Sequence, residues 1–307
     1  MEFFKQHTKI DFMSRRMRII TATISTILFL CSIAVLAVNG LNFGLDFTGG
    51  LQIEVNYAQG ANLTNVRSNL HEAGFPEARV QSYGNTQAVL ISLQVPKGQK
   101  QETIVTKVKS ALQQATVERV DYVGPQVGKQ LATQGVLALL VALIATMLYI
   151  AMRFEYRFAV SSALALIHDP LLILGIFAFF HIEFDLPALA AVLAVIGYSL
   201  NDTIVVFDRV RENFRKLRKN SSLEVMNISI NQTLSRTIMT SALTLVAVLA
   251  LLFLGGEKIH SFALAMTIGI VIGTYSSIYV AGALALLMGL SRKDFLPPAK
   301  TELDEMP

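Results

Sequence analysis

Long apolar runs, separated by short charged segments, dominate the chain. A helix needs about 20 apolar residues to cross a bilayer core of roughly 30 Å. Six runs approach or exceed this length, namely residues 19–38, 135–152, 159–180, 186–207, 238–254 and 262–290. The first run lacks a small-x-small cleavage site, so we expect it to remain as an anchor. The pattern predicts a polytopic α-helical membrane protein with six transmembrane helices.

Basic residues are unevenly distributed over the segments between these runs. They gather before the first run, between the second and third, between the fourth and fifth, and after the sixth, at Lys5, Lys9, Arg15, Arg16, Arg18, Arg153, Arg157, Arg209, Arg211, Arg215, Lys216, Arg218, Lys219, Arg236, Arg292, Lys293 and Lys300. The opposite short loops contain only Lys258. Because cytoplasmic loops are enriched in lysine and arginine, both termini (1–18 and 291–307) and the basic loop 208–236 are expected in the cytoplasm.

Residues 39–134 alone have the composition of a soluble domain, and the same rule places them in the periplasm or its equivalent. Their periodicity changes from strand-like to helical and back. Strands are expected at residues 51–56, 79–83, 87–93 and 117–123, and helices at 63–70 and 104–112. The order β-α-β-β-α-β predicts a ferredoxin-like α+β domain between the first helix and the remaining five, which occupy 135–290.

The composition supports the membrane class. Apolar residues make up 53% of the chain, charged residues 16%, and the mean hydropathy is +0.51, which is unusual for a soluble protein of this length. The single cysteine, Cys31, excludes an intrachain disulfide. The net charge of +4 comes from blocks at the ends of the apolar runs. That placement indicates membrane topology and contact with anionic lipid headgroups rather than nucleic-acid binding.

Motifs for the commoner enzymatic reactions are absent from the sequence. It contains no phosphate-binding GxxxxGK[ST] loop, no paired-cysteine or HExxH metal motif and no GxSxG nucleophile motif. We therefore expect neither an enzyme nor a bound cofactor or metal.

Ionisable residues inside the apolar runs are the candidate functional residues, because each costs a few kcal/mol or more to place in a membrane. Asp202, preceded by Asn201, lies in the fourth run about 10 Å of helix from Arg209. Its helical face is apolar, so we expect it to point into the bundle. A carboxylate there can carry a proton or bind a cation. The alternative is a structural aspartic acid that is hydrogen-bonded to a neighbouring helix.

A second polar group opens the fifth run. It consists of Arg236 and a stripe of hydroxyl side chains at Thr233, Thr237, Thr240, Ser241 and Thr244. Arg236 is the natural electrostatic partner of Asp202, because a long guanidinium side chain can reach inward from the boundary. In the other interpretation Arg236 marks the interface and the hydroxyls bond their own carbonyls.

Two further features remain open from sequence alone. His168, Asp169 and Pro170 lie near the middle of the third run, where they form either a proton relay or a structural polar knot at a kink. Gly269, Gly273, Ser276 and Ser277 lie on one side of the sixth run and predict close helix packing.

Three motifs resemble the SecF branch of the SecD/SecF family, within the RND superfamily. They are residues 44–50 (GLDFTGG), 123–128 (VGPQVG) and 197–213 (GYSLNDTIVVFDRVREN). The first two contain the turn or hinge candidates Gly44, Asp46, Gly49, Gly50, Gly124, Pro125 and Gly128. The third is the most specific, and the likeness extends over essentially the whole chain.

The resemblance implies half of an RND-type membrane core in a bacterial inner membrane, with SecD as the other half. It implies association with the SecYEG channel and YajC, and late-stage export of an unfolded polypeptide driven by a proton or sodium gradient. It also implies that Asp202 and Arg236 couple ion movement to export, and the further ion-coupling candidates are Asn201, Thr240 and Asp169. Two alternatives are half of a small-molecule RND-like exporter and a passive scaffold of the translocon.

Overall fold

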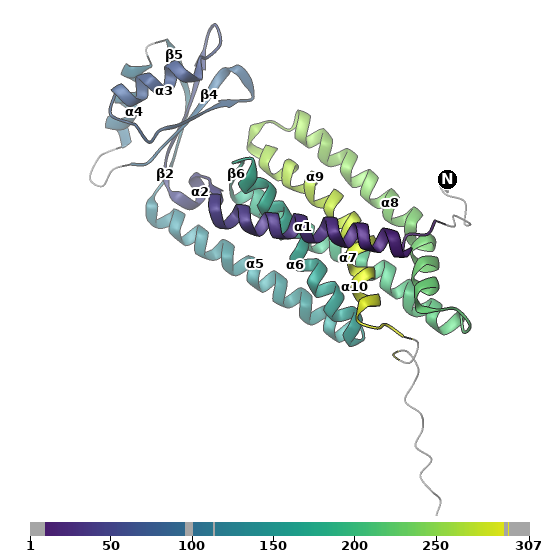
Figure 1. The fold of residues 1–307 in the computed structure, drawn as a ribbon. Helices are drawn as coiled ribbons and strands as arrows, with labels where there is room; N and C mark the ends of the chain where they lie inside the picture. Colours follow the sequence, from purple (N-terminus) through teal and green to yellow (C-terminus); the bar gives the residue numbers. More distant parts are fainter. Residues whose placement is uncertain (1–9, 96–100, 113, 292–293, 295–307) are drawn as a thin grey trace, which may run out of the picture.

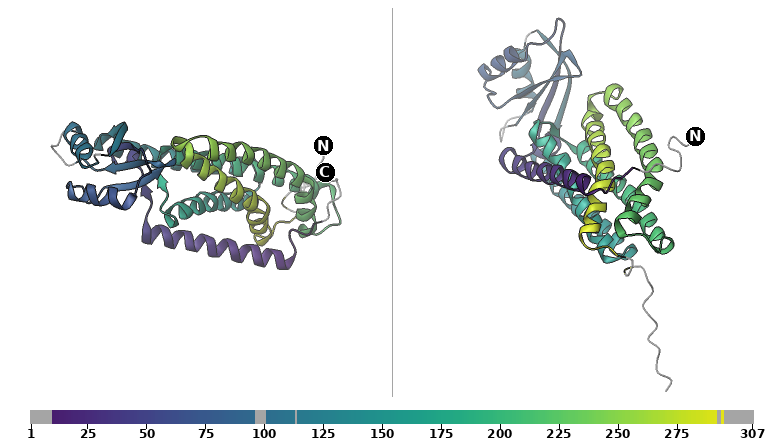
Figure 2. Two further views of the ribbon diagram at one scale, coloured as in Figure 1. Left: turned by 90° about the horizontal axis from the view of Figure 1, so that it is seen from above. Right: turned by 45° about the vertical axis from the view of Figure 1, so that its right-hand side comes forward.

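The computed structural model describes residues 10–95, 101–112, 114–291 and 294. It contains a long helical bundle with a small α+β domain at one end (Figure 1). The start of α1 and the turn between α7 and α8 lie at the other end of the bundle (Figures 1 and 2). One end of the molecule therefore carries the α+β domain and the other carries only helix ends and a short turn, as expected for a membrane protein with one extramembrane domain.

The described residues include six helical segments that are long and apolar enough to cross a membrane, which confirms the predicted number. They are α1 Arg15–Asn39, α5 Pro125–Arg153, α6 Tyr156–Phe179, α7 Leu186–Lys216, α8 Ser222–Leu254 and Glu257–Leu287. The last segment begins with a 3₁₀ turn and continues as α9 His260–Tyr275, a π-helix Ser276–Val280 and α10 Ala281–Leu287. The protein is a multi-pass membrane protein.

Most of the segment expected to be a basic loop, residues 208–236, is helical. Helix α7 continues to Lys216 and α8 begins at Ser222, so only residues 217–221 form the turn. Glu212 explains the continuation of α7, because it pairs with Arg209 at 2.6 Å and with Lys216 at 2.5 Å along the helix. Ser221 starts α8 with a capping box that Glu224 completes. The loop prediction failed because the many charged residues of this segment obscured its buried apolar positions, such as Val210 and Phe214 of α7 and Ile230 of α8.

The small domain has the predicted ferredoxin-like topology. Its elements are β2 Gly50–Tyr57, α3 Leu63–Glu72, β3 Arg79–Tyr83, β4 Asn85–Leu93, α4 Gln101–Ala111 and β5 Ala115–Val123. All neighbouring strands are antiparallel in the order β3-β4-β2-β5. Apolar side chains of β2, β3 and β4 and of both helices form the core, and Leu51, Ile53 and Leu70 are fully buried in it. Helices α3 and α4 lie on one face of the sheet (Figure 1).

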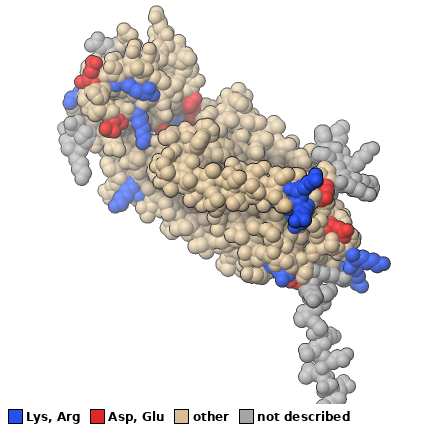
Figure 3. All heavy atoms as spheres, in the orientation of Figure 1, with Lys and Arg blue, Asp and Glu red and all other residues tan. Residues whose placement is uncertain are grey.

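Burial is unequal among the membrane helices. The apolar windows of α6, α7 and the last segment are half buried or more, whereas those of α1, α5 and α8 are mostly exposed. Charged side chains gather at both ends of the bundle and leave an uncharged band on the visible face between them (Figure 3). Such a band fits a hydrocarbon layer. Helix α7 is therefore one of the central helices.

Small residues allow the central helices to approach closely, as the sixth run predicted. A Cβ added at Gly269 would lie 2.2 Å from Cγ2 of Val195, and one at Gly273 would lie 3.0 Å from Cβ of Ser199. These contacts fix α9 against α7 side by side. Ile270 and Val195 are buried at this contact, so the register of α9 on α7 is well defined.

Candidate functional site

Asp202 lies inside the bundle, as its apolar helical face predicted. Its side chain on α7 is 4% exposed, and Val195 and Val206 on the same face are buried. The Oδ2 atom is buried and contacts no hydrogen-bond partner among the described residues. An unpaired carboxylate in a low-dielectric interior is costly. This atom is therefore available to a ligand.

Arg236, Asn201 and Thr240 occupy the outer surface of the bundle. All three are exposed in this chain, although α7 and α8 carry them at the level of the spans. The Arg236 guanidinium lies close enough to interact electrostatically with the Asp202 carboxyl. Within the part of the chain that the structure describes, the two groups do not form an ion pair within 4.0 Å. The structure brings them near each other without joining them.

The hydroxyl stripe of α8 divides into two faces. Thr233, Thr237 and Ser241 are buried, whereas Thr240 is exposed and Thr244 is partly exposed. Three of these side chains donate to the carbonyl of the preceding turn, namely Thr233, Thr240 and Thr244, at 2.8–3.0 Å. For these three, the interpretation in which hydroxyls bond their own helix describes the structure. Ser241 instead contacts neighbouring helices, and Thr237 has no such bond.

Asp169 belongs to a buried network that joins three helices. Ser25 Oγ of α1 lies 2.7 Å from Nε2 of His168, and His168 Nδ1 lies 2.9 Å from Oδ1 of Asp169. Ser199 of α7 donates to Oδ2 of Asp169, and the Phe29 ring stacks on His168. Both carboxylate oxygens therefore have partners. A fully satisfied network of this kind stabilises helix packing.

This network ends one helical turn from Asp202 on α7. Thr203 Oγ1 donates to the Ser199 carbonyl at 3.2 Å, as hydroxyls in helices commonly do. Among the described residues no hydrogen bond links Asp169 to Asp202. The sequence did not identify Ser25 and Ser199, although both are polar residues inside apolar runs and that signal was visible.

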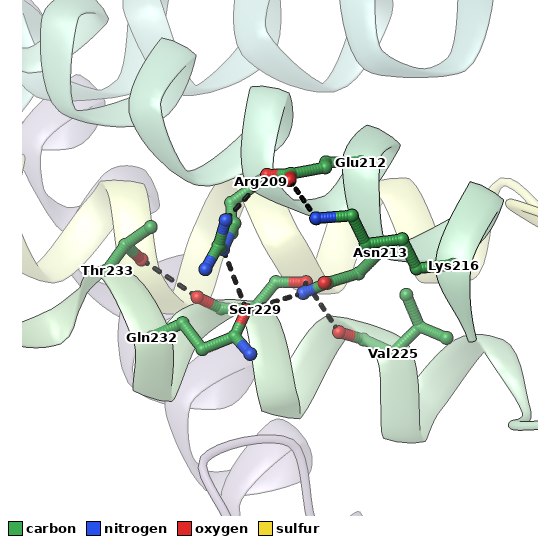
Figure 4. Close-up of polar contacts among 8 residues, drawn as sticks. All are labelled: Arg209, Glu212, Asn213, Lys216, Val225, Ser229, Gln232 and Thr233. Carbon is green, nitrogen blue, oxygen red and sulfur yellow. Dashed lines mark hydrogen bonds and ion pairs between the residues drawn. The ribbon is translucent and has the colours of Figure 1, made fainter. Parts of the chain in front are cut away.

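The α7–α8 hairpin is held by a network of polar side chains (Figure 4). Asn213 Nδ2 donates to Ser229 Oγ and to Gln232 Oε1, each at 2.8 Å, and Arg209 Nε donates to Gln232 Oε1 at 2.7 Å. Ser229 in turn donates to the Val225 carbonyl at 2.7 Å. These bonds fix the antiparallel register of α7 and α8. They therefore set which residue of α8 lies level with Asp202.

The glycine motifs form a tightly packed joint between the membrane helices and the small domain. A Cβ at Gly128 would lie 2.7 Å from the nitrogen of Gly49, and one at Gly49 would lie 2.8 Å from Cα of Pro125. Gly50 has φ +135° and would place a Cβ 2.4 Å from the Leu93 carbonyl oxygen. Only glycine tolerates this combination of backbone angle and contact. In this arrangement these glycines serve close packing and a turn.

The other two glycines of these motifs have different surroundings. A Cβ at Gly44 would lie 2.8 Å from Oε1 of Glu183, next to the short parallel pair of β1 Asn42–Phe43 and β6 Glu183–Phe184. Gly124 has no atom of the described residues within 4 Å of an added Cβ, and it precedes Pro125 at the start of α5. Gly124 therefore has space that Gly49 and Gly50 lack.

Asp46 connects this joint to the helix of Asp202. It lies on α2 Leu45–Thr48, and its Oδ2 accepts a hydrogen bond from the Leu186 N–H at 3.0 Å. Asp185, the N-cap of α7, accepts from the Ala188 N–H at 2.8 Å and from Ser261 Oγ at 2.7 Å. Burial raises the pKa of the Asp185 carboxyl, and the hydrogen bonds from Ser261 and Ala188 partly oppose this shift. Two carboxyl groups therefore satisfy the first N–H groups of α7.

A cleft of about 630 Å³ separates the open face of the sheet from the nearby ends of α7 and α9. Glu54 and Arg119 lie on the domain side, and Glu257 and Lys258 on the helix side. The Gln81 amide donates to the Glu183 carboxyl across it at 2.9 Å. The described residues contain no group of three His, Cys, Asp or Glu side chains that could hold a metal ion.

Comparisons with known proteins agree with these features. The family described as "Protein export membrane protein SecD/SecF, C-terminal" matches residues 102–291, and the "SecD/SecF GG Motif" matches residues 34–61. The Vibrio alginolyticus protein translocase subunit SecF is 48% identical over 92% of this chain and 93% of its own length. The Pseudomonas aeruginosa subunit SecF is 49% identical over 87% of this chain and 89% of its own length.

Solved structures show the same fold. The crystal structure of SecDF from Thermus thermophilus, described as a translocon-associated membrane protein, is 39% identical with a TM-score of 0.84 and covers 94% of this chain. This chain spans 40% of that longer one. A SecDF structure in a "Super-membrane-facing form" is 36% identical with a TM-score of 0.63, covering 92% of this chain and 39% of the other. The chain therefore belongs to the SecD/SecF family of protein export membrane proteins, among relatives named as SecF subunits of the protein translocase.

Proposed function

We propose that this chain is the ion-coupled half of a SecDF-type complex, which uses a proton or sodium gradient to assist a late stage of protein export. The observation that carries the proposal is Asp202. It is a buried carboxyl with an unpartnered oxygen, on a central helix and near the charge of Arg236. Intramembrane ionisable groups of this kind favour ion movement over a structural role.

The exposed polar groups support a second helical partner. Arg236, Asn201 and Thr240 are exposed beside spans that must otherwise meet lipid. Lipid offers the Arg236 and Asn201 side chains no hydrogen bonds, so other protein should cover them. The Thermus thermophilus SecDF chain is more than twice as long as the part that this chain matches. A SecD subunit is the proposed partner, and SecYEG and YajC are the proposed assembly around the pair.

A route from the ion site to the domain supports coupling. Asp202 lies 16 residues after Leu186 on one continuous helix, which is about 24 Å. The start of that helix is bound by Asp46 of α2, which leads through the glycine joint into β2, a central strand of the sheet. The two SecDF structures match this chain with different TM-scores at nearly equal coverage. That difference is expected if SecDF chains adopt more than one arrangement.

The proposal is tested by export in inverted inner-membrane vesicles that contain this chain and its SecD partner. A precursor is first arrested after the ATP-dependent stage, and a proton gradient or a sodium gradient is then imposed. We expect one of the gradients to accelerate completion severalfold, and depletion of this chain to remove the acceleration.

Two outcomes contradict the proposal. A passive scaffold gives the same rate with and without a gradient while depletion slows both. A small-molecule exporter leaves precursor completion unchanged by depletion and changes dye efflux from the vesicles instead.

We also propose the orientation that the basic segments predict, with both termini and residues 217–221 in the cytoplasm and the α+β domain in the periplasm of a bacterial inner membrane. Single cysteines in a Cys31→Ser background test it. A membrane-impermeant reagent added outside should label Gln59→Cys, at an exposed position of the small domain, and Lys258→Cys, at an exposed position that lines the cleft beside that domain. It should label Lys219→Cys only after the membrane is opened. Labelling at position 219 from outside refutes the orientation.

A further inference from the structure

Three buried oxygen atoms on three different elements have no hydrogen-bond partner among the described residues. They are Oδ2 of Asp202 on α7, Oγ1 of Thr237 on α8 and Oγ of Ser276 in the π-helix. The three side chains are at most 4% exposed. A buried polar group without a partner costs about 1–3 kcal/mol. Three such groups require a common explanation if they lie together.

The helix contacts place Thr237 level with Asp202. Tyr198 of α7 donates to Ser241 of α8 at 3.1 Å. The two helices are antiparallel and are joined by residues 217–221. Moving one helical turn toward this connection leads from Tyr198 to Asp202 on α7 and from Ser241 to Thr237 on α8. Both steps are four residues, about 6 Å.

The same reasoning places Ser276 at this level. Gly269 packs on Val195 and Gly273 packs on Ser199, so α9 runs parallel to α7 with a constant offset of 74 residues. Continuing this register for three residues takes Ser199 to Asp202 and Gly273 to Ser276. Helix α7 packs against both α9 and the π-helix, and α8 packs against α9. The three unpartnered oxygens therefore come from three neighbouring elements at one depth.

Neighbouring hydroxyl groups have hydrogen-bond partners, unlike those of Thr237 and Ser276. Thr233 donates to the Ser229 carbonyl at 3.0 Å, and Ser277 donates to the Thr274 carbonyl at 3.1 Å. Ser241 and Thr274 bond each other at 2.7 Å. Only Thr237 and Ser276, of the buried hydroxyls at this junction of the described helices, have no partner. A π-helical segment begins at Ser276, and such segments are frequent at functional sites.

We propose that Thr237 and Ser276, together with Asp202, form the binding site of the coupling ion. The inference rests on the proposed function of Asp202 and adds two ligands to it. One carboxylate and two hydroxyl oxygens offer three acceptors to a small monovalent cation, either Na⁺ or a hydronium ion, which makes three hydrogen bonds. Arg236, near the same carboxyl, provides a competing positive charge that favours release of the ion.

The test uses Thr237→Val and Ser276→Ala, which remove the hydroxyls and preserve the approximate shape of the side chains. The matched controls are Thr233→Val on the same face of α8 and Ser277→Ala in the same π-helix, whose hydroxyls bond main-chain carbonyls. Each variant is placed in the full complex in inverted vesicles. One arm varies NaCl against choline chloride at fixed pH, and the other varies the imposed proton gradient without added sodium.

We expect Thr237→Val and Ser276→Ala to raise the ion concentration for half-maximal stimulation at least about fivefold, the effect of losing one oxygen contact to a charged ligand. The maximal rate at saturating ion should persist. The increase in half-saturating concentration should occur in the experiment, sodium or proton, to which the unmodified complex responds. That response identifies the coupling ion. The controls should keep the half-saturation of the unmodified complex.

A second readout separates binding from structure. Because neither hydroxyl has a hydrogen-bond partner among the described residues, its removal should leave the thermal unfolding temperature of the purified complex in choline chloride unchanged or higher. If both variants keep the half-saturating ion concentration of the unmodified complex, Thr237 and Ser276 are not ligands of the ion. This conclusion holds even where Asp202→Asn abolishes the gradient response. A gradient response that survives in Asp202→Asn overturns the proposed function itself.

Discussion

Gradient-stimulated export is expected to fall to the rate measured without a gradient when Asp202 is replaced by asparagine. The amide keeps the size of the carboxyl and can donate as well as accept hydrogen bonds, but it neither titrates nor attracts a cation strongly. Asp202 is 4% exposed and one of its oxygens has no partner among the described residues, so the substitution removes charge without breaking a described hydrogen bond. The complex should therefore assemble normally.

The measurement compares completion of an arrested precursor with and without the gradient, together with the amount of complex in the membrane. Asp208→Asn is the matched control, since Asp208 lies on the same helix in a partly exposed pair with Arg153 at 2.6 Å. Surface pairs contribute about 1 kcal/mol or less. Asp208→Asn should respond to the gradient as the unmodified complex does. A normal response in accumulated Asp202→Asn shows that Asp202 is structural.

The second large effect is expected from Gly50→Ala. The alanine would need φ near +135° and would place its Cβ 2.4 Å from the Leu93 carbonyl oxygen, in the backbone of the paired strand β4. Backbone strain and overpacking together should lower the free energy of unfolding by about 2–5 kcal/mol. Thermal unfolding of the purified complex and the amount of protein in the membrane measure the loss.

Two glycines of the same chain serve as graded controls. Gly40 has φ +67°, and no atom of the residues that the structure describes lies within 4 Å of an added Cβ, so Gly40→Ala tests strain without a clash. Gly124 has neither a positive φ nor a close contact, so Gly124→Ala should be close to neutral. Equal effects of Gly50→Ala and Gly40→Ala contradict the packing explanation. A free hinge at residues 49–50 predicts a neutral Gly50→Ala.

The membrane spans and the α+β domain were predictable because their signals are local. A span is a long apolar run. In β2 the buried Leu51, Ile53 and Val55 alternate with more exposed polar residues, which is the period of a strand. The helical part of segment 208–236 was missed because its buried apolar positions, such as Val210, Phe214 and Ile230, are spread among charged and polar residues. Asn213, Ser229 and Gln232 stabilise the hairpin across the turn, and a pattern of hydrophobicity does not show such contacts.

The candidate site was predictable only in part. Asp202 stood out because an aspartate in an apolar run is costly wherever it points. Its apolar neighbours also gave the correct helical face. The sequence could not distinguish Thr237 from Thr233, since both are threonines one turn apart on α8 and only the structure shows which one bonds its own carbonyl. Ser276 was seen as a packing residue because the π-helix that it begins leaves no sequence signal.

If the small domain moves together with α7, the contacts that break during the movement must cost less free energy than the coupling ion supplies. One monovalent ion that crosses 100 mV releases about 2.3 kcal/mol. A tilt of α7 by about 10° at Asp202 moves its far end by about 4 Å, given the 24 Å helix between them. The bonds that yield during such a stroke must together cost less than the ion supplies. Surface hydrogen bonds such as Gln81 to Glu183 are worth about 0.5–1.5 kcal/mol each, so the energy of a single ion suffices to break about one to four of them.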